Sequence, residues 1–162
     1  MTTCAWAKSV ALGCLNSKSA EYMKLSSQMC WTATFHVALL AGCIDQAKYN
    51  TLKSNARIES ALAGGQRIRN ATEMRGVPGG YLIYFVHGVK PIHAMISTDN
   101  GMAAGNKNNC VGVGKAVGWE QLNLASNLDW GGAADIRVPG LVSAEKREVS
   151  VFCYPITELA NR

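Results

Sequence analysis

Apolar and polar positions follow helical spacing through the first sixty residues of the chain. Apolar residues in segments 5–15, 22–25 and 31–40 recur about every three to four positions, which is typical of helices with one buried face. A fourth helix is expected over 45–62, with Gly64 and Gly65 ending it. The N-terminal part of the chain is therefore predicted to be helical.

The pattern changes after Gly76 to short runs rich in β-branched and aromatic residues. "YLIYFVH" (81–87) and "PIHAMIST" (91–98) predict two strands, "DNG" (99–101) predicts a turn, and "MAAGNKN" (102–108) predicts the returning strand. Segments 136–138 and 149–154 are further strand candidates. We therefore expect an α+β fold, in which N-terminal helices pack on a C-terminal antiparallel β-sheet, as a single domain over 1–162.

Composition agrees with a globular protein. Of the 162 residues, 48% are hydrophobic and 17% are charged. No apolar run reaches the roughly 18 residues that span a bilayer, so no membrane partner is expected. The N-terminus lacks a basic region and Lys8 interrupts its apolar stretch, which predicts a folded helix in place of a signal peptide. The expected location is cytoplasmic, or outside the cell by a dedicated secretion system that needs no cleavable signal peptide.

Charge and cysteine usage exclude several classes of site. The net charge of +5 is scattered, and the densest basic cluster, Arg67, Arg69 and Arg75, lies in an expected Gly-rich loop without interleaved aromatic residues. Nucleic acid is therefore an unlikely partner. The six cysteines are widely spaced and neither Cys nor His recurs at ligand spacing, so we expect reduced thiols, no metal and no cofactor.

Cys30 opens the strongly apolar segment "CWTATFHVALLAGC" (30–43). The polar run before it, with Ser26 or Ser27 as the cap, predicts that Cys30 lies within one turn of a helix N-terminus. The positive end of the helix dipole lowers a thiol pKa, and free N–H groups there can stabilise an oxyanion. The helix is expected to be buried through Trp31, Phe35, Leu39 and Leu40. The alternative is that Cys30 is one more buried core thiol.

A nucleophilic cysteine needs a base, and the chain has three histidines. His36 follows Cys30 by six residues, about 600° around the helix, so it points to the opposite side and cannot be the base. His87 is expected to end a strand before a loop. His93 begins the strand that leads into the predicted hairpin, and is the expected base.

The hairpin supplies a residue to orient the imidazole. If Asn100-Gly101 is a two-residue loop, His93 faces Asn108; if Asp99-Asn100 forms the turn, His93 faces Asn106. Both asparagines are expected on the face of His93, since side chains alternate along a strand. The predicted site is therefore Cys30 as nucleophile, His93 as base and Asn108 or Asn106 as the orienting residue.

These residues resemble a known family. A Cys-Trp pair heading an apolar helix, a strand with "HA", and an Asn beyond a turn are similar to the papain-like thiol hydrolases, and "HAMISTDNGMAAG" (93–105) resembles the histidine hairpin of the NlpC/P60 cell-wall peptidases. The oxyanion glutamine of papain-type enzymes is replaced here by Lys24, and Gln28 lies only two residues before Cys30. The resemblance implies a divergent branch of this superfamily, which includes bacterial effector toxins.

The expected function is that of a cysteine peptidase or amidase acting through an acyl-enzyme. The resemblance implies a peptide, peptidoglycan or protein as substrate, and for a toxin a cognate immunity protein as partner. Glutamine deamidation and acyl transfer use the same intermediate and remain open. The alternative from another class is a non-enzymatic binding or immunity module.

Overall fold

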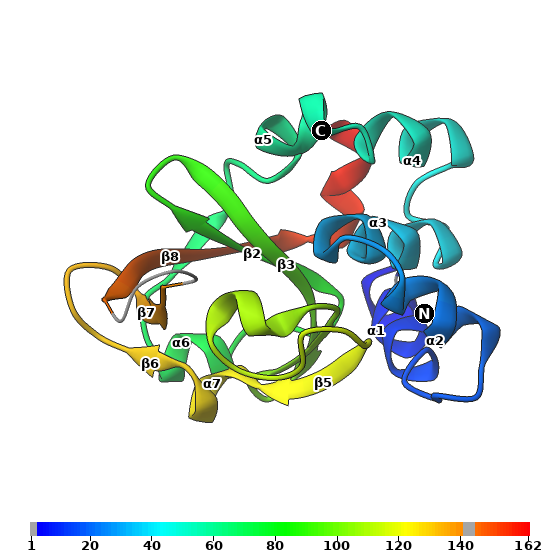
Figure 1. The fold of residues 1–162 in the computed structure, drawn as a ribbon. Helices are drawn as coiled ribbons and strands as arrows, with labels where there is room; N and C mark the ends of the chain where they lie inside the picture. The colour runs from blue at the N-terminus through cyan, green and yellow to red at the C-terminus, as the bar shows by residue number, and fades with distance from the viewer. Residues whose placement is uncertain (1–2, 141–144) are drawn as a thin grey trace.

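The computed structural model describes residues 3–140 and 145–162, and within them an antiparallel sheet with most of its helices on one face and two short helices on the other (Figure 1). The helical elements are α1 (Thr3–Gly13), α2 (Ala20–Ser26), α3 (Cys30–Leu40), α4 (Gln46–Leu52), η1 (Asn55–Arg57), α5 (Ile58–Ala61), α6 (Ala71–Arg75), η2 (Asn108–Val111), α7 (Leu124–Asn127) and η3 (Ile156–Asn161). The strands are β1 (Gln66–Ile68), β2 (Tyr81–His87), β3 (Lys90–Asp99), β4 (Met102–Gly105), β5 (Glu120–Asn123), β6 (Asp129–Trp130), β7 (Ile136–Pro139) and β8 (Lys146–Pro155).

The sheet has the order β5-β4-β3-β2-β8-β7-β6, with β1 added against β8, and every pairing is antiparallel. Side chains of β2 alternate between two apolar cores, as the period of a strand requires. Leu82 and Tyr84 face the core beneath α1 and α3, and Ile83 and Phe85 face a second core with α6 and α7. The predicted α+β class is confirmed.

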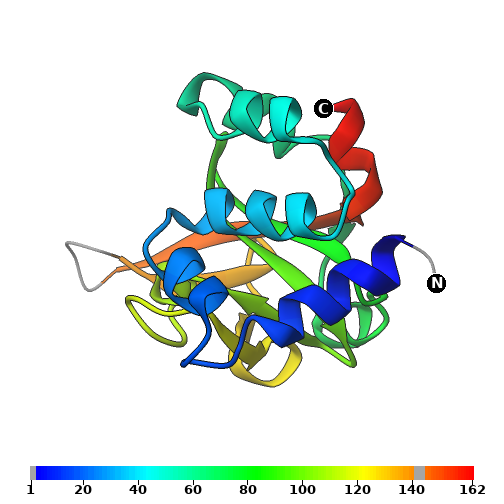
Figure 2. The same cartoon turned by 90° about the vertical axis from the view of Figure 1, so that its right-hand side faces the viewer.

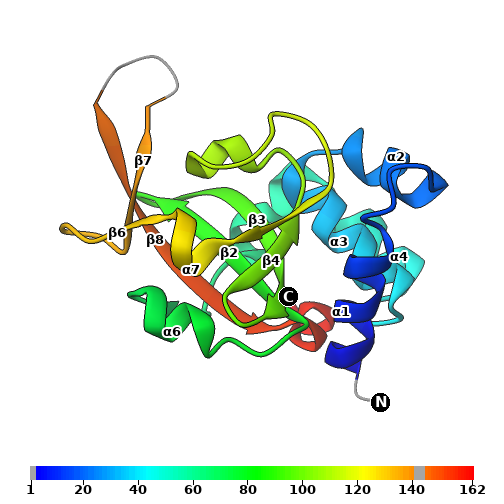
Figure 3. The same cartoon turned by 90° about the horizontal axis from the view of Figure 1, so that it is seen from below.

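Helices α1 to α4 form one layer, α6 and α7 lie on the opposite face of the sheet, and the sheet curls away from the main helical layer (Figure 1). Figure 2 shows α3 lying across the sheet, with α4 and η3 stacked above it and α1 alongside. Seen from below, β6, β7 and the first part of β8 lie at the end of the molecule away from α1 to α4 (Figure 3). Helix α3, which begins at Cys30, packs against strand β3.

The helix predictions need three corrections. The single helix expected over 45–62 is broken into α4, η1 and α5, because Ser54 and Asn55, which prefer turns to helix interiors, interrupt it. Neither Ser26 nor Ser27 caps α3, since its N-cap is Met29 without a side-chain bond, and Ser27 ends α2. Leu40 is exposed, and Trp31 and Leu39 are half-buried, so of the four residues expected to bury α3 only Phe35 is fully buried.

The β2–β3–β4 hairpins lie where the sequence predicts them, but the register differs. Asn100 and Gly101 form the predicted turn, with Asp99 paired to Met102. A bulge then shifts the register, so that Ser97 pairs with Ala103 and the later residues no longer follow the predicted pairing. Strand β4 also ends at Gly105, so residues 106–108 are not strand. The predicted strand placement of Asn106 and Asn108 is wrong.

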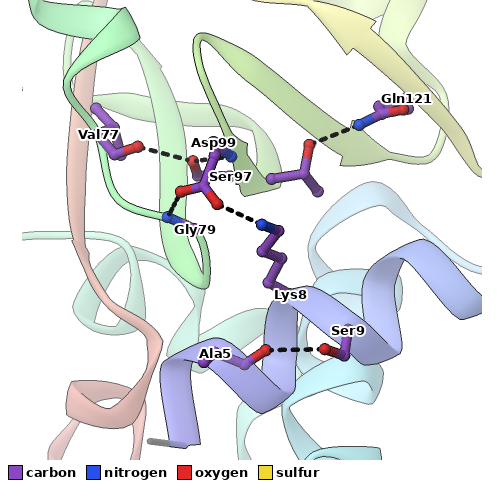
Figure 4. Close-up of polar contacts among 9 residues, drawn as sticks. Ala5, Lys8, Ser9, Val77, Gly79, Ser97, Asp99 and Gln121 are labelled. Carbon is purple, nitrogen blue, oxygen red and sulfur yellow. Dashed lines mark hydrogen bonds and ion pairs between the residues drawn. The ribbon is translucent and has the colours of Figure 1, made fainter.

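An ion pair ties the N-terminal helix to this hairpin. Lys8 of α1 donates to the Asp99 carboxylate, which also accepts the Gly79 N–H at 2.5 Å (Figure 4). Asp99 has φ +79°, a left-handed conformation that Asp tolerates better than most residues. Lys8 holds the pKa of the Asp99 carboxyl below its usual range. The contact fixes α1 against the end of β3.

The basic cluster is also corrected. Arg67 lies on β1 and Arg75 on α6, and only Arg69 lies in the short connection between them. Arg67 Nε donates to both carboxylate oxygens of the buried Asp135, at 3.0 and 3.1 Å. Arg67 thus joins β1 to the segment before β7. No helix in the described ranges is long and apolar enough to cross a membrane.

Candidate active site

Cys30 is the first residue of α3, as the sequence predicts. Its side chain is 3% exposed, and Sγ lies 3.9 Å from the carbonyl oxygen of Ile92 on β3. Strand β4 pairs only with residues 96–99 of β3, so the edge of β3 around Ile92 and Ala94 has no strand partner in the described sheet. The thiol of Cys30 occupies this open edge.

The expected lowering of the Cys30 pKa is wrong for this closed arrangement. Burial raises the pKa of the thiol to about 12, and the neighbouring Cys110 thiol adds to the effect. Backbone N–H groups of Ala94 and Trp31, which lie near the sulfur, oppose the rise without overcoming it. Cys30 is therefore a neutral thiol in this structure, because desolvation of the charged form outweighs the helix terminus.

His93 is completely buried and bonded to Asn108. Its Nε2 lies 2.8 Å from Asn108 Oδ1, which is the pairing that the sequence predicts. The other ring nitrogen, Nδ1, has no hydrogen-bond partner among the described residues. Burial lowers the pKa of His93 to about 4, although the bond to Asn108 acts in the opposite direction. His93 is therefore neutral, with one nitrogen oriented and the other unoccupied.

The ring of His93 faces the second core, where it lies 5.6 Å from the ring of Phe85. Cys30 approaches the same strand from the side of the helices, at the backbone of the two residues that flank His93. Nδ1 of the ring has no hydrogen-bond partner among the described residues, so the predicted hydrogen bond between the Cys30 thiol and this nitrogen is not formed. The two groups reach β3 from different sides: the thiol lies at its backbone on the helix side, and the ring faces the second core.

Asn108 reaches His93 by a different path from the predicted one. After β4 ends, Lys107 adopts φ +58° and the chain turns into η2, which carries Asn108 over the edge of β3. Gly105 makes this approach possible, because a Cβ there would lie 2.7 Å from Asn108 Oδ1 and 2.8 Å from Met95 Cγ. The sequence therefore predicted the His93–Asn108 pair correctly, but from a hairpin register that differs from the one in the structure.

Asn106 does not share the site with His93, which corrects the second candidate. Its Nδ2 donates to the carbonyl oxygens of Leu25, Ser26 and Gln28, at 2.9, 3.2 and 2.7 Å, and its Oδ1 accepts the Gly118 N–H at 2.8 Å. The buried Asn106 side chain thus holds the segment that leads into α3. It positions Cys30 through the backbone of residues 25–28.

Gln28 is held in a separate polar cluster. Its Nε2 lies 3.1 Å from His36 Nδ1 and 3.1 Å from the Tyr49 hydroxyl. His36 lies on α3 away from the Cys30 site, as its spacing predicts, and packs on the Tyr49 ring at 5.4 Å. The Gln28 amide is therefore engaged away from Cys30.

Sequence reasoning missed Glu120 at the start of β5. Glu120 Oε1 accepts from Asn108 Nδ2 at 3.2 Å, although it lies twelve residues along the chain and belongs to no recognisable motif. Cys14, Cys30, Cys110 and Cys153 are free thiols, and the side chain of Cys4 lies outside the described residues. Glu120 became visible only through the fold.

A surface depression lies at the start of α3, although the buried Cys30 does not itself line it. It encloses about 270 Å³ and is lined by Met29 and Trp31, which flank Cys30 in sequence, together with Ile58, Glu59, Lys90 and Pro91. A second depression of about 220 Å³ shares Glu59 and Pro91 with the first and continues over Val86, Val89 and Phe152. The two form one largely apolar groove from the start of α3 to the β2–β3 hairpin.

Comparisons of the chain with family models, with curated proteins and with solved structures gave no match.

Proposed function

We propose that the protein is a cysteine-dependent peptidase or amidase of the papain-like kind, with Cys30 as nucleophile, His93 as base and Asn108 as the orienting residue. The observation that carries the proposal is the His93–Asn108 bond of 2.8 Å, which engages Nε2 and leaves Nδ1 without a partner among the described residues. The two residues that flank His93, Ile92 and Ala94, contact the Cys30 sulfur through their backbone. A buried imidazole that is bonded at one nitrogen only is unusual for a purely structural histidine.

In the proposed reaction the lone pair on His93 Nδ1 acts as the base. His93 Nδ1 takes the thiol proton as the Cys30 sulfur forms a bond to the substrate carbonyl carbon, and the carbonyl electron pair moves onto oxygen. N–H groups in the first turn of α3 stabilise that oxyanion. The intermediate collapses with cleavage of the C–N bond, and the leaving amine receives the proton from His93.

Water completes the cycle. His93 Nδ1 removes a proton from water as its oxygen attacks the thioester carbon, the C–S bond breaks, and the carboxylic acid leaves while Cys30 regains its proton. Because both groups are neutral and buried before the reaction, substrate binding has to bring Sγ and Nδ1 into contact. Catalytic hydrogen bonds often shorten only in the substrate complex.

The groove supports access of a peptide to Cys30. Met29 and Trp31 lie on either side of Cys30 in sequence and line the groove, so a chain lying in it passes the start of α3. An extended peptide, a peptidoglycan stem peptide or a protein loop each fits this arrangement. An effector toxin that cleaves such an amide, paired with an immunity protein that covers the groove, is the biological setting we propose.

Glutamine deamidation and acyl transfer differ from hydrolysis only in the amine that leaves or the nucleophile that follows, so they share the acyl-enzyme. The second candidate is a binding or immunity module, which catalyses no reaction. The burial of the Cys30 thiol favours this candidate, since a structural thiol is also neutral and shielded from solvent.

Acylation by p-nitrophenyl acetate separates the two, because an activated ester needs no specific substrate. We expect a burst of nitrophenol and an acetyl group on Cys30, identified by peptide mass mapping. His93→Ala and Cys30→Ala remove the burst, and Cys153→Ala, a buried thiol on β8, serves as the matched control that keeps it. Acetylation spread over several thiols, or unchanged in His93→Ala, would favour the binding module.

A further inference from the structure

The carboxylate of Glu120 lies on the far side of Asn108 from His93. Asn108 Nδ2 donates to Glu120 Oε1 at 3.2 Å and to the Gly105 carbonyl oxygen at 3.0 Å. The same Oε1 accepts the Lys115 N–H at 2.6 Å, which fixes the carboxylate. Three elements, β3, η2 and β5, thus contribute one line of contacts from carboxylate to carboxamide to imidazole.

The two acceptors determine which way the Asn108 amide is turned. A carbonyl oxygen and a carboxylate accept hydrogen bonds and do not donate them, so the group that faces both is the NH₂. Oδ1 is then the atom that faces His93, and since it only accepts, Nε2 carries the ring proton. In a neutral imidazole this leaves a lone pair on Nδ1, the nitrogen to which no described residue is hydrogen-bonded.

Two glycines make room for this line of contacts. A Cβ on Gly105 would lie 2.7 Å from Asn108 Oδ1, and a Cβ on Gly114 would lie 2.1 Å from Glu120 Oε1. Gly114 also has φ +80°, which side chains other than glycine rarely adopt. The backbone is therefore shaped around both polar side chains and not around Asn108 alone.

We propose that Glu120 is a positioning residue of the thiol site: it sets the tautomer of His93 through Asn108 and stabilises the imidazolium that forms when His93 takes the Cys30 proton. The inference rests on the proposed function for its second half. Its first half, the tautomer, is a property of the folded protein whether or not Cys30 reacts. The negative charge of Glu120 acts through the carboxamide on the positive charge that develops on the ring.

The tautomer is measured by long-range ¹H–¹⁵N NMR of the histidine rings at pH 7. Wild-type His93 is expected to be protonated at Nε2 only. Glu120→Gln, which can present its amide oxygen to both donors, retains that tautomer, and Glu120→Ala gives a mixture of tautomers. The matched control is Glu148→Ala, which removes a carboxylate that likewise accepts a backbone N–H, from Ala133 at 3.0 Å. An unmixed Nε2–H tautomer in Glu120→Ala would overturn the inference.

The electrostatic effect of the Glu120 carboxylate is tested by the pH dependence of Cys30 alkylation with iodoacetamide. Without the negative charge the thiolate–imidazolium pair is less stable, so Glu120→Gln should raise the midpoint of the acid limb by about half a pH unit or more, roughly a threefold slower rate on that limb. Glu148→Ala leaves the midpoint unchanged. A profile in Glu120→Gln identical to wild type would overturn the electrostatic role. If wild-type Cys30 does not react selectively at all, the proposed function fails, and the tautomer experiment still decides whether Glu120 positions His93.

Discussion

His93 and Asn108 are joined by a 2.8 Å contact between Nε2 and Oδ1, and neither side chain is exposed to solvent. The bond closes a short excursion of the chain, from β3 through β4 into η2, over the edge of β3 where the Cys30 sulfur also lies. A polar pair with no access to water is costly unless its hydrogen bonds are satisfied, and within the described ranges His93 Nδ1 has no partner. Our proposal that the pair is functional rests on that nitrogen.

Burial of a neutral histidine makes stability depend on pH. The pKa of His93 is lowered from 6.5 to about 4, so between these values the unfolded chain binds a proton that the folded protein excludes. Stability therefore falls as the pH decreases through this window, by about 3 kcal/mol in total. Above pH 6.5 this contribution does not change with pH.

Urea unfolding at several pH values checks this prediction. His93→Gln keeps an amide N–H for Asn108 but has no titrating ring, so its stability should fall less between pH 6.5 and 4 than that of the wild type. Comparing the two proteins cancels the contribution of His36, whose pKa burial also lowers. Parallel curves for the two proteins would show that His93 titrates normally when folded.

The two asparagines should respond to substitution in different measurements. Asn106→Ala removes the four hydrogen bonds of a buried side chain, three to the segment before Cys30 and one to Gly118, and should lower the free energy of unfolding by about 2 to 4 kcal/mol. Asn108→Ala should slow Cys30 acylation more strongly, because His93 loses its orienting acceptor. Chemical denaturation and p-nitrophenyl acetate kinetics on both variants measure the contrast. If one variant showed the larger loss in both stability and acylation rate, the two asparagines would not have the separate roles assigned to them.

Gly105 should not tolerate a side chain. Gly105→Ala places a Cβ against Asn108 Oδ1 and Met95 Cγ, and the overpacking should cost about 1 to 3 kcal/mol. Gly13→Ala is the control, since nothing lies within 4 Å of its added Cβ. Thermal unfolding of both variants is the measurement; equal melting temperatures would mean that the close approach at Gly105 is easily relaxed.

The Lys8–Asp99 pair should contribute modestly and in a salt-dependent way. Both side chains are partly exposed, so Lys8→Met should destabilise the protein by less than about 1 kcal/mol. Because Lys8 depresses the pKa of Asp99, the stabilisation is present above the usual pKa of 3.8 and is lost as pH falls below it. The difference between Lys8→Met and wild type should therefore shrink at pH 3 and in high salt; a constant difference would indicate lost packing.

The sequence predicted the elements whose signals are local. The runs of β-branched and aromatic residues in β2 and β3, the Asn100-Gly101 turn and the start of α3 at Cys30 all depend on neighbouring residues and are confirmed. The break at Ser54 was missed because the apolar spacing continues across it. A pattern of apolar positions indicates which face is buried and does not show where backbone bonds stop.

The candidate site was predicted only in part, for physical reasons that lie outside any short segment. A bulge near Ser97 and the left-handed Lys107 change the path to Asn108, and neither has a clear sequence signal. The pKa of Cys30 was expected to fall because the helix terminus is visible in the sequence, whereas the burial that raises it comes from β3 and η2. Glu120 was missed because only the fold brings it to Asn108.

Selective alkylation of Cys30 tests the central claim most directly. The wild-type protein is treated with iodoacetamide at pH 7, and peptide mapping follows the modification rates of Cys30, Cys14 and Cys153. Burial raises the pKa of Cys14 and Cys153 to about 11 and that of Cys30 to about 12, so a thiol without a catalytic partner should be slowest at Cys30. Our account predicts that Cys30 is instead the fastest of the three and loses this advantage in His93→Ala. Cys30 as the slowest thiol, with a rate that does not depend on His93, would contradict it.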